Sequence, residues 1–296
     1  MRIRQQRSPQ FVILLIALYT GAVGSFLYFL LNGWQYYTLP LALRIRNPLY
    51  NQLKPGGIHG HFFGILGSSM LILMLSYSAR KRLRFMSNWG TLPRWLDIHI
   101  FFGLVGPLFI ILHSTFKLNG LVAISFWSMI AVALSGIVGR FLYLQIPRNI
   151  KGAELTLEDV KKLKRQINDQ LQQYAPADTD ITEYIKKRLI SQTDNKANFG
   201  ILIWRIVQSG FLLRFRRQHI ARHFSKRFGL PPEQMRELIV LILQRDLLER
   251  RIALWTHIHR YFHYWHVFHK PFAILMYLIM FIHVGIAIWL GYQWIL

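Results

Sequence analysis

The sequence contains no cysteine, and acidic residues are scarce over most of its length. The lack of cysteine excludes disulfides, cysteine-ligated iron–sulfur clusters and the covalent attachment of c-type haem. No Asp or Glu occurs before Asp97 or after Glu249, and twelve of the thirteen acidic residues lie between Glu154 and Glu249. The chain therefore divides into acid-poor parts and one part of mixed charge.

The formal net charge is +23, and 53% of the residues are hydrophobic. A strongly basic chain is one sign of nucleic-acid binding. Basic residues that flank long apolar segments are, however, what membrane insertion requires. We therefore expect a membrane protein in contact with lipid, and no nucleic-acid partner.

Five apolar segments are long enough to cross a hydrocarbon core about 30 Å thick. They are Phe11–Leu31, Ile58–Ser78, Leu96–Phe116, Leu121–Ile146 and His269–Leu290. The first has an alternative interpretation as a signal peptide, because Ala22-Val23-Gly24 is a weak small-residue cleavage pattern. The apolar run continues past these residues, which favours an uncleaved anchor.

Basic residues cluster in the first seven positions and again between Ala79 and Arg94. Because cytoplasmic loops carry the excess of Lys and Arg, both regions are predicted to be cytoplasmic. The segments 32–57 and 117–120 then lie outside, as does the end of the chain at Leu296. This orientation suits a multi-pass protein of the plasma membrane, or bacterial inner membrane, and makes the third and fifth spans run in the same direction.

The predicted fold is all-α, with five transmembrane helices and a helical cytoplasmic insertion. Residues 1–32 form an anchor, 58–146 hold spans two to four, 147–253 form the insertion, and 254–296 hold span five. In the insertion, Thr156 and Asp159 resemble a capping box. An apolar stripe then predicts an amphipathic helix, and its members are Val160, Leu163, Ile167 and Leu171. Further helices are expected over 180–191, over 199–228, and from Pro231-Pro232 through Glu249. The segment 199–228 is predicted to lie on the membrane surface, and the alternative is a buried core helix followed by a solvated basic one.

Histidines at one spacing mark two of the spans. His99 and His113 lie fourteen residues apart in the third span, and His269 and His283 have the same spacing in the fifth. Fourteen helical residues rise about 21 Å and rotate by only about 40°, so both rings of a pair face one way at two depths. Ionisable residues within spans are rare and usually functional. The repeated spacing therefore points to a functional arrangement.

Two helices with matched histidine pairs can hold two flat cofactors, one above the other. Haem is the favoured cofactor, because imidazole is a common axial ligand of haem iron. Parallel spans pair their ligands in chain order, so His99 pairs with His269 on the cytoplasmic side and His113 with His283 on the outer side. The sequence thus predicts two non-covalent haem b groups whose iron ligands are these four histidines.

Four basic residues near the cytoplasmic ends of spans are candidate partners of haem propionates. They are Arg94, Arg140, Arg260 and Lys270. The alternative is that they serve only the positive-inside distribution of charge. Two other histidine groups are weaker candidates. His219 and His223 have the i, i+4 spacing of metal ligands but no evident third ligand, and the histidines between 257 and 266 alternate with aromatic residues, as in an interfacial belt.

The two histidine-bearing stretches resemble a known family. W-L-D-I-H-I-F-F-G-L-V-G-P-L-F-I-I-L-H, residues Trp95–His113, and H-K-P-F-A-I-L-M-Y-L-I-M-F-I-H, residues His269–His283, are similar to the haem helices of ferric-reductase-like transmembrane domains. Respiratory cytochromes b likewise use histidine pairs on two parallel helices. The resemblance covers roughly residues 58–146 and 269–290. It implies transmembrane electron transfer through two b haems held by His99, His113, His269 and His283.

The chain departs from that family in two ways. Ferric reductases and NADPH oxidases usually continue into a flavin and nicotinamide domain, whereas this chain ends six residues after Leu290 and its insertion has no G-x-G-x-x-G loop. The insertion itself is foreign to the family pattern. We therefore expect an electron-transfer subunit that works with other redox subunits, soluble electron carriers or quinone. The alternatives are a histidine-lined proton or metal-ion transporter, and a membrane anchor whose haems only assist assembly.

Overall fold

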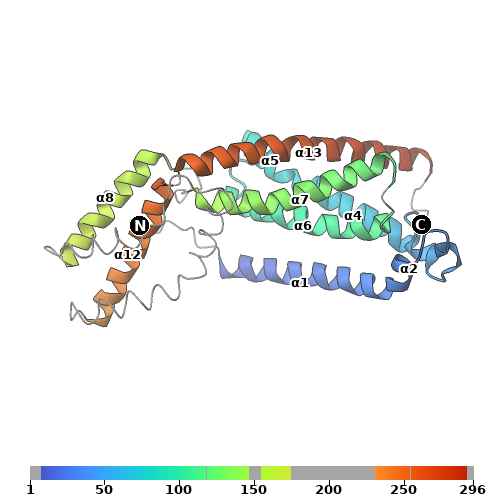
Figure 1. The fold of residues 1–296 in the computed structure, drawn as a ribbon, viewed down its shortest axis with the longest axis horizontal. Helices are drawn as coiled ribbons and strands as arrows, with labels where there is room; N and C mark the ends of the chain where they lie inside the picture. Colours follow the sequence, from blue (N-terminus) through green and yellow to red (C-terminus); the bar gives the residue numbers. More distant parts are fainter. Residues whose placement is uncertain (1–7, 118, 147–154, 175–230, 254, 292–296) are drawn as a thin grey trace. The chain divides into compact units, whose positions relative to one another are not determined.

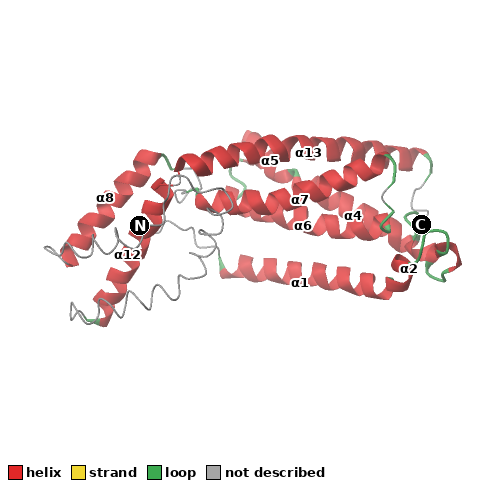
Figure 2. Cartoon of the chain, in the orientation of Figure 1, coloured by secondary structure: helices red, strands yellow, loops and turns green. Residues whose placement is uncertain are grey.

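The computed structural model describes residues 8–117, 119–146, 155–174, 231–253 and 255–291. Every regular element within these ranges is a helix, and they contain no strand (Figures 1 and 2). The chain divides into two compact units. We call residues 1–144, 148–153 and 261–296 the membrane unit, and residues 145–147 and 154–260 the insertion unit.

Five stretches of helix are long and apolar enough to cross a membrane, as the sequence predicts. They are Pro9–Asn32, Tyr50–Arg82, Leu92–Ser114, Leu121–Gln145 and His257–Trp289. Four correspond to or lie within the helices α1 (Pro9–Asn32), α6 (Leu92–Ser114), α7 (Leu121–Gln145) and α13 (Trp255–Trp289). The remaining stretch, Tyr50–Arg82, combines α3 (Tyr50–Leu53), α4 (Ile58–Met74) and α5 (Ser76–Arg82). The prediction of an all-helical fold with five helices long and apolar enough to cross a membrane is confirmed for the described residues.

Several boundaries and connecting segments differ from those predicted. The helix of the last span, α13, begins at Trp255 and not at His269, because the aromatic and histidine residues before His269 are also helical. The second span extends past Ser78 to Arg82, after a tightened turn at Leu75 whose N–H donates to Ile72 O at 2.9 Å. The segment expected to be a loop between 32 and 57 also contains α2 (Trp34–Thr38) and a 3₁₀ turn, Arg44–Arg46.

Local signals account for where the long helices begin and end. Ser8 caps α1 by accepting a hydrogen bond from Phe11 N at 3.4 Å, with Pro9 following it, and Gly33 ends the helix. Both α6 and α13 contain an internal proline, Pro107 and Pro271, and each helix continues through it. An internal proline is tolerated in a membrane helix because neighbouring groups can satisfy the carbonyl that it frees.

In the membrane unit, α4, α6, α7 and α13 lie side by side (Figure 1). One buried cluster joins α4 and α6 through residues that include Phe63, Val105 and Leu112. A second joins α4, α7 and α13 through Leu71, Met74, Phe126, Met129, Met276 and Met280. Close approach of α4 and α6 depends on glycine: a Cβ on Gly67 would meet Ile110 at 2.7 Å.

A buried arginine, Arg44, forms hydrogen bonds at the C-terminal end of α6. Arg44 is 7% exposed, and its guanidinium donates to the carbonyl oxygens of Leu39 (2.9 Å), Tyr37 (2.8 Å) and Thr115 (2.6 Å). Thr115 has a left-handed backbone, with φ of 48°. Burial, with Tyr36 beside it, raises the pKa of Tyr37 to about 12, so its phenol stays protonated at neutral pH. Arg44 thus holds the 37–44 segment against the C-terminal end of α6.

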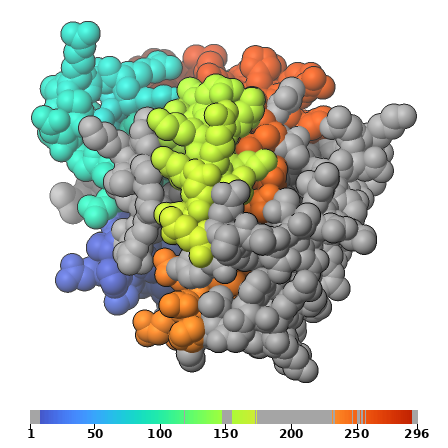
Figure 3. Space-filling model, turned by 90° about the vertical axis from the view of Figure 1, so that its left-hand side faces the viewer, coloured from blue at the N-terminus to red at the C-terminus, as the bar shows by residue number. Residues whose placement is uncertain are grey.

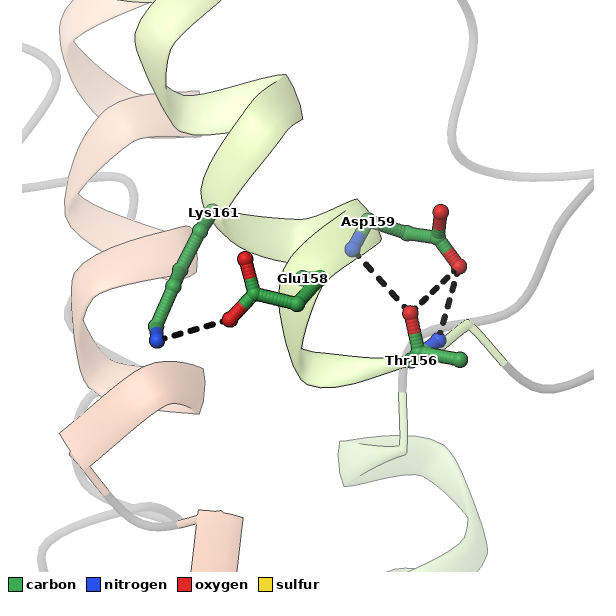
Figure 4. A network of polar contacts seen from close by, with 4 residues as sticks. All are labelled: Thr156, Glu158, Asp159 and Lys161. Atoms are coloured by element: carbon green, nitrogen blue, oxygen red, sulfur yellow. Dashed lines mark hydrogen bonds and ion pairs between the residues drawn. The ribbon is translucent and has the colours of Figure 1, made fainter.

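The insertion unit is built from α8 (Leu157–Tyr174) and α12 (Pro232–Ala253), which pack against each other. The predicted capping box is present: Thr156 Oγ1 accepts from Asp159 N at 3.1 Å, and Asp159 Oδ2 accepts from Thr156 N at 3.0 Å (Figure 4). Val160, Ile167 and Leu171 are buried, as the stripe predicts, and Leu163, its fourth member, is half-buried. Side chains of α8, drawn yellow-green, form part of the surface seen in Figure 3.

The start of α12 at Pro232 agrees with the predicted helix after Pro231-Pro232, and α12 continues four residues past Glu249 to Ala253. Lys164 of α8 forms an ion pair with Glu249 at 2.6 Å. The helices expected over 180–191 and 199–228, and with them His219 and His223, lie outside the described residues.

Candidate functional site

The structure places His113 of α6 beside His283 of α13, as one of the two predicted pairs requires. The ring centres of His113 and His283 lie 6.3 Å apart, with their planes at 62°. The side chains of all four predicted histidines are half-buried. The contact between His113 and His283 agrees with the predicted chain-order pairing, and the pairing of His99 with His269 stays a prediction.

Two of the histidines, both on α6, are oriented by backbone carbonyls of α4. His99 Nδ1 lies 3.0 Å from Met74 O, and His113 Nδ1 lies 2.8 Å from Gly60 O. A carbonyl oxygen can only accept, so in each contact Nδ1 carries the proton and donates it. The lone pair of each neutral ring is then on Nε2, which is the form that binds a metal ion.

The helix α4 is shaped for these two contacts. Met74 is its last residue, where carbonyl oxygens lack a regular helical partner, so its oxygen is available to His99. Gly64 makes room for the other ring: a Cβ at this position would meet His113 Nδ1 at 2.7 Å. The second span, which carries none of the predicted ligands, thus positions half of them.

A different partner orients His269. Its Nδ1 lies 2.7 Å from the hydroxyl oxygen of Ser135, on α7. The ring of Trp265 lies 4.7 Å from that of His269, and its indole N–H donates to Ser135 O at 2.7 Å. The indole rests where a Cβ on Gly139 would be. Ser135 therefore anchors both Trp265 and His269 to α7.

The His113–His283 separation fits one metal ion held between two imidazoles. A metal–imidazole bond is about 2.0 Å, and a ring nitrogen lies about 1.1 Å from its ring centre, so two opposed ligands have ring centres about 6 Å apart. The described residues contain no group of three or more His, Asp or Glu side chains able to hold a metal ion. Two imidazoles per site suit a metal whose remaining ligands come from a macrocycle.

The four basic candidates occupy different environments. Arg140 forms an ion pair with Asp97 at 3.0 Å, and the two side chains are 20% and 6% exposed. Arg94 lies with its guanidinium 5.8 Å from the ring centre of Phe11. Lys270 and Arg260 are exposed, and Arg260 belongs to the insertion unit. Their pairing with propionates stays a prediction.

Sequence reasoning missed the residues that support the ligands. Ser135 and Trp265 have no recognisable motif, and the acceptors on Met74 and Gly60 are main-chain atoms without any side-chain signal. It also missed the Asp97–Arg140 ion pair, although Asp97 was available as the one acidic residue outside 154–249. No protein-family model, no curated protein and no solved structure matches this chain.

Proposed function

We propose that this chain is a membrane cytochrome b that holds two haem b groups and relays electrons across the bilayer. The observation that carries the proposal is the contact between His113 and His283, whose ring centres lie 6.3 Å apart, close to the separation expected of two imidazoles on one metal ion. The repeated fourteen-residue spacing and the Nδ1 contacts of His99, His113 and His269 support it.

Each part of the chain has a role in this proposal. His99 with His269, and His113 with His283, hold the two irons. The carbonyls of Met74 and Gly60 and the hydroxyl of Ser135 fix ring orientation and tautomer, and the apolar helices keep water away. Haem b, when bound, supplies one-electron chemistry at an iron without an open position, which suits electron transfer rather than oxygen activation. Donor and acceptor are redox subunits, soluble carriers or quinone.

Paired substitution tests the proposal on purified protein. Wild type should contain two haems per chain by the pyridine haemochrome assay. His113→Ala and His283→Ala should each remove the same spectral component, and His99→Ala and His269→Ala should each remove the other. His59→Ala is the matched control, because His59 packs against Phe29 and Phe63 and should leave both haems bound.

Two results would refute the proposal. One is protein that binds no haem although haem was supplied in excess, which is the result expected of a histidine-lined transporter. The other is loss of the same haem in His113→Ala and in His269→Ala. That result would pair His113 with His269, whereas parallel third and fifth spans pair His113 with His283.

A further inference from the structure

The three positioned histidines do not have equivalent partners. His99 and His113 donate to main-chain carbonyls, whereas His269 is bonded to a side-chain hydroxyl, that of Ser135. A carbonyl can only accept, but a hydroxyl can donate or accept. The role of Ser135 therefore depends on where its own proton goes.

The helix α7 determines the direction of that proton. Ser135 Oγ donates to Val132 O, three residues earlier, at 2.9 Å. A hydroxyl has one proton, so with that proton committed to Val132 the oxygen faces His269 with a lone pair. His269 must then carry its proton on Nδ1 and donate it to Ser135. The chain of bonds runs from the His269 ring to the Ser135 hydroxyl to the Val132 carbonyl.

Trp265 contacts both Ser135 and His269. Its indole donates to the backbone carbonyl of Ser135 while its ring packs against His269. The same residue of α7 thus receives two donors from α13, four residues apart on one face of that helix. The position of the His269 ring is set by Ser135 and Trp265 together.

We propose that Ser135 is a positioning residue that fixes His269 in the tautomer with a free Nε2 and tunes the reduction potential of one haem alone. The inference rests on the proposed function. An acceptor that bonds the Nδ1–H of a ligating histidine raises the basicity of its imidazole, and a more basic ligand favours ferric iron. Removing the acceptor should therefore raise the potential of the haem bound by His99 and His269.

The chain offers a matched control. Ser125 is also on α7, is buried, and donates to a carbonyl of α13, that of Met276, at 3.0 Å. Ser125→Ala removes one α7–α13 hydrogen bond, as Ser135→Ala does, but touches no histidine. Ser135→Thr keeps a hydroxyl that can bond the preceding turn and is the conservative rescue.

The experiment is a redox titration of full-length protein that has bound both haems, combined with electron paramagnetic resonance of the oxidised form. We expect Ser135→Ala to keep both haems, to raise the midpoint potential of the component lost in His269→Ala, and to change the g-values of that component only. Ser135→Thr should restore wild-type values, and Ser125→Ala should leave both potentials unchanged.

Three outcomes would overturn the inference. They are unchanged potentials and g-values in Ser135→Ala, equal shifts of both haems, and an effect reproduced by Ser125→Ala. Wild-type protein with no haem would overturn the proposed function as well, so the two failures are distinguishable.

Discussion

Gly64 shows how one missing side chain controls the position of a predicted ligand. A methyl group on its Cα would lie 2.7 Å from His113 Nδ1 and 2.8 Å from its Cε1, closer than side chains tolerate. The ring of His113 must move if that methyl is present, and with it the hydrogen bond to Gly60 O. We therefore expect Gly64→Ala to weaken or abolish binding of the haem held by His113 and His283.

The measurement is the haem content and visible spectrum of purified Gly64→Ala. The component lost in His113→Ala should decline and the other should stay. Gly136→Ala is the control, because a Cβ on Gly136 meets nothing within 4 Å. Full occupancy of both haems with unshifted spectra in Gly64→Ala would contradict the role assigned to this glycine.

At this scale the sequence is informative about ligands and silent about their supports. The four histidines are recoverable because fourteen residues is nearly a whole number of helical turns, which any α-helix converts into one face. Ser135 is not recoverable, since its importance depends on which residue of α13 packs opposite it. The carbonyl of Met74 matters because α4 ends there, and neither fact has a side-chain signature.

At the level of elements, Arg44 joins the C-terminal end of α6 to the segment 37–44. Arg44 supplies hydrogen bonds to three carbonyl groups and places a cation at a helix C-terminus, which the helix dipole favours. Arg44→Ala leaves these buried acceptors without their donor. We expect the free energy of unfolding to fall by about 3 kcal/mol.

Unfolding in mixed detergent micelles, followed by the loss of tertiary signal, measures this change. Arg46 lies in the same 3₁₀ turn but is exposed, so Arg46→Ala should stay within about 0.5 kcal/mol of wild type. Equal stabilities for the two variants would show that the Arg44 contacts contribute nothing.

The capping box of α8 gives a prediction that depends on pH. The Thr156 hydroxyl, and after it the Thr156 backbone N–H, lower the pKa of Asp159. Because the folded pKa is below the unfolded value of about 3.9, the contribution of Asp159 is complete above that value and is lost as pH falls through the folded pKa. Hydrogen exchange of residues 157–163, corrected for intrinsic rates, should therefore accelerate in acid.

Thr156→Ala should accelerate the same exchange at neutral pH, since losing an N-cap costs about 1 kcal/mol. Lys161→Ala is the matched control: Lys161 bonds Glu158 at the surface, and such pairs contribute little. Hydrogen-exchange rates of residues 157–163 that change neither in Thr156→Ala nor in acid would contradict the role of the cap.

The elements themselves were predictable to different degrees. Long apolar runs identify all five potential spans because length and hydropathy alone define them. The short helix α2 and the Arg44–Arg46 turn escape such reasoning, since three to five residues cannot display a helical period. The true start of α13 was missed because its first fourteen residues are polar and aromatic rather than uniformly apolar.

For the whole molecule, orientation is the property that the proposed function most needs. Basic residues at Arg80, Lys81, Arg82 and Arg84 predict that this end of the membrane unit is cytoplasmic. A reporter inserted near position 178 should then be active in its cytoplasmic form, and one fused after Leu296 only in its exported form. Both reporters on the same side of the membrane would rule out five crossings.

The Asp97–Arg140 ion pair has a consequence for biosynthesis. Each residue alone costs up to about 3 kcal/mol when its helix leaves the translocon, less toward the helix ends. Their 3.0 Å contact joins α6 to α7, so the two charges neutralise each other only when both helices are present. We expect α6 and α7 to partition into lipid as a hairpin rather than one after the other. In a glycosylation-mapping assay, a chain truncated after α6 should insert that helix less efficiently than one that includes α7, and Arg140→Leu should remove the benefit.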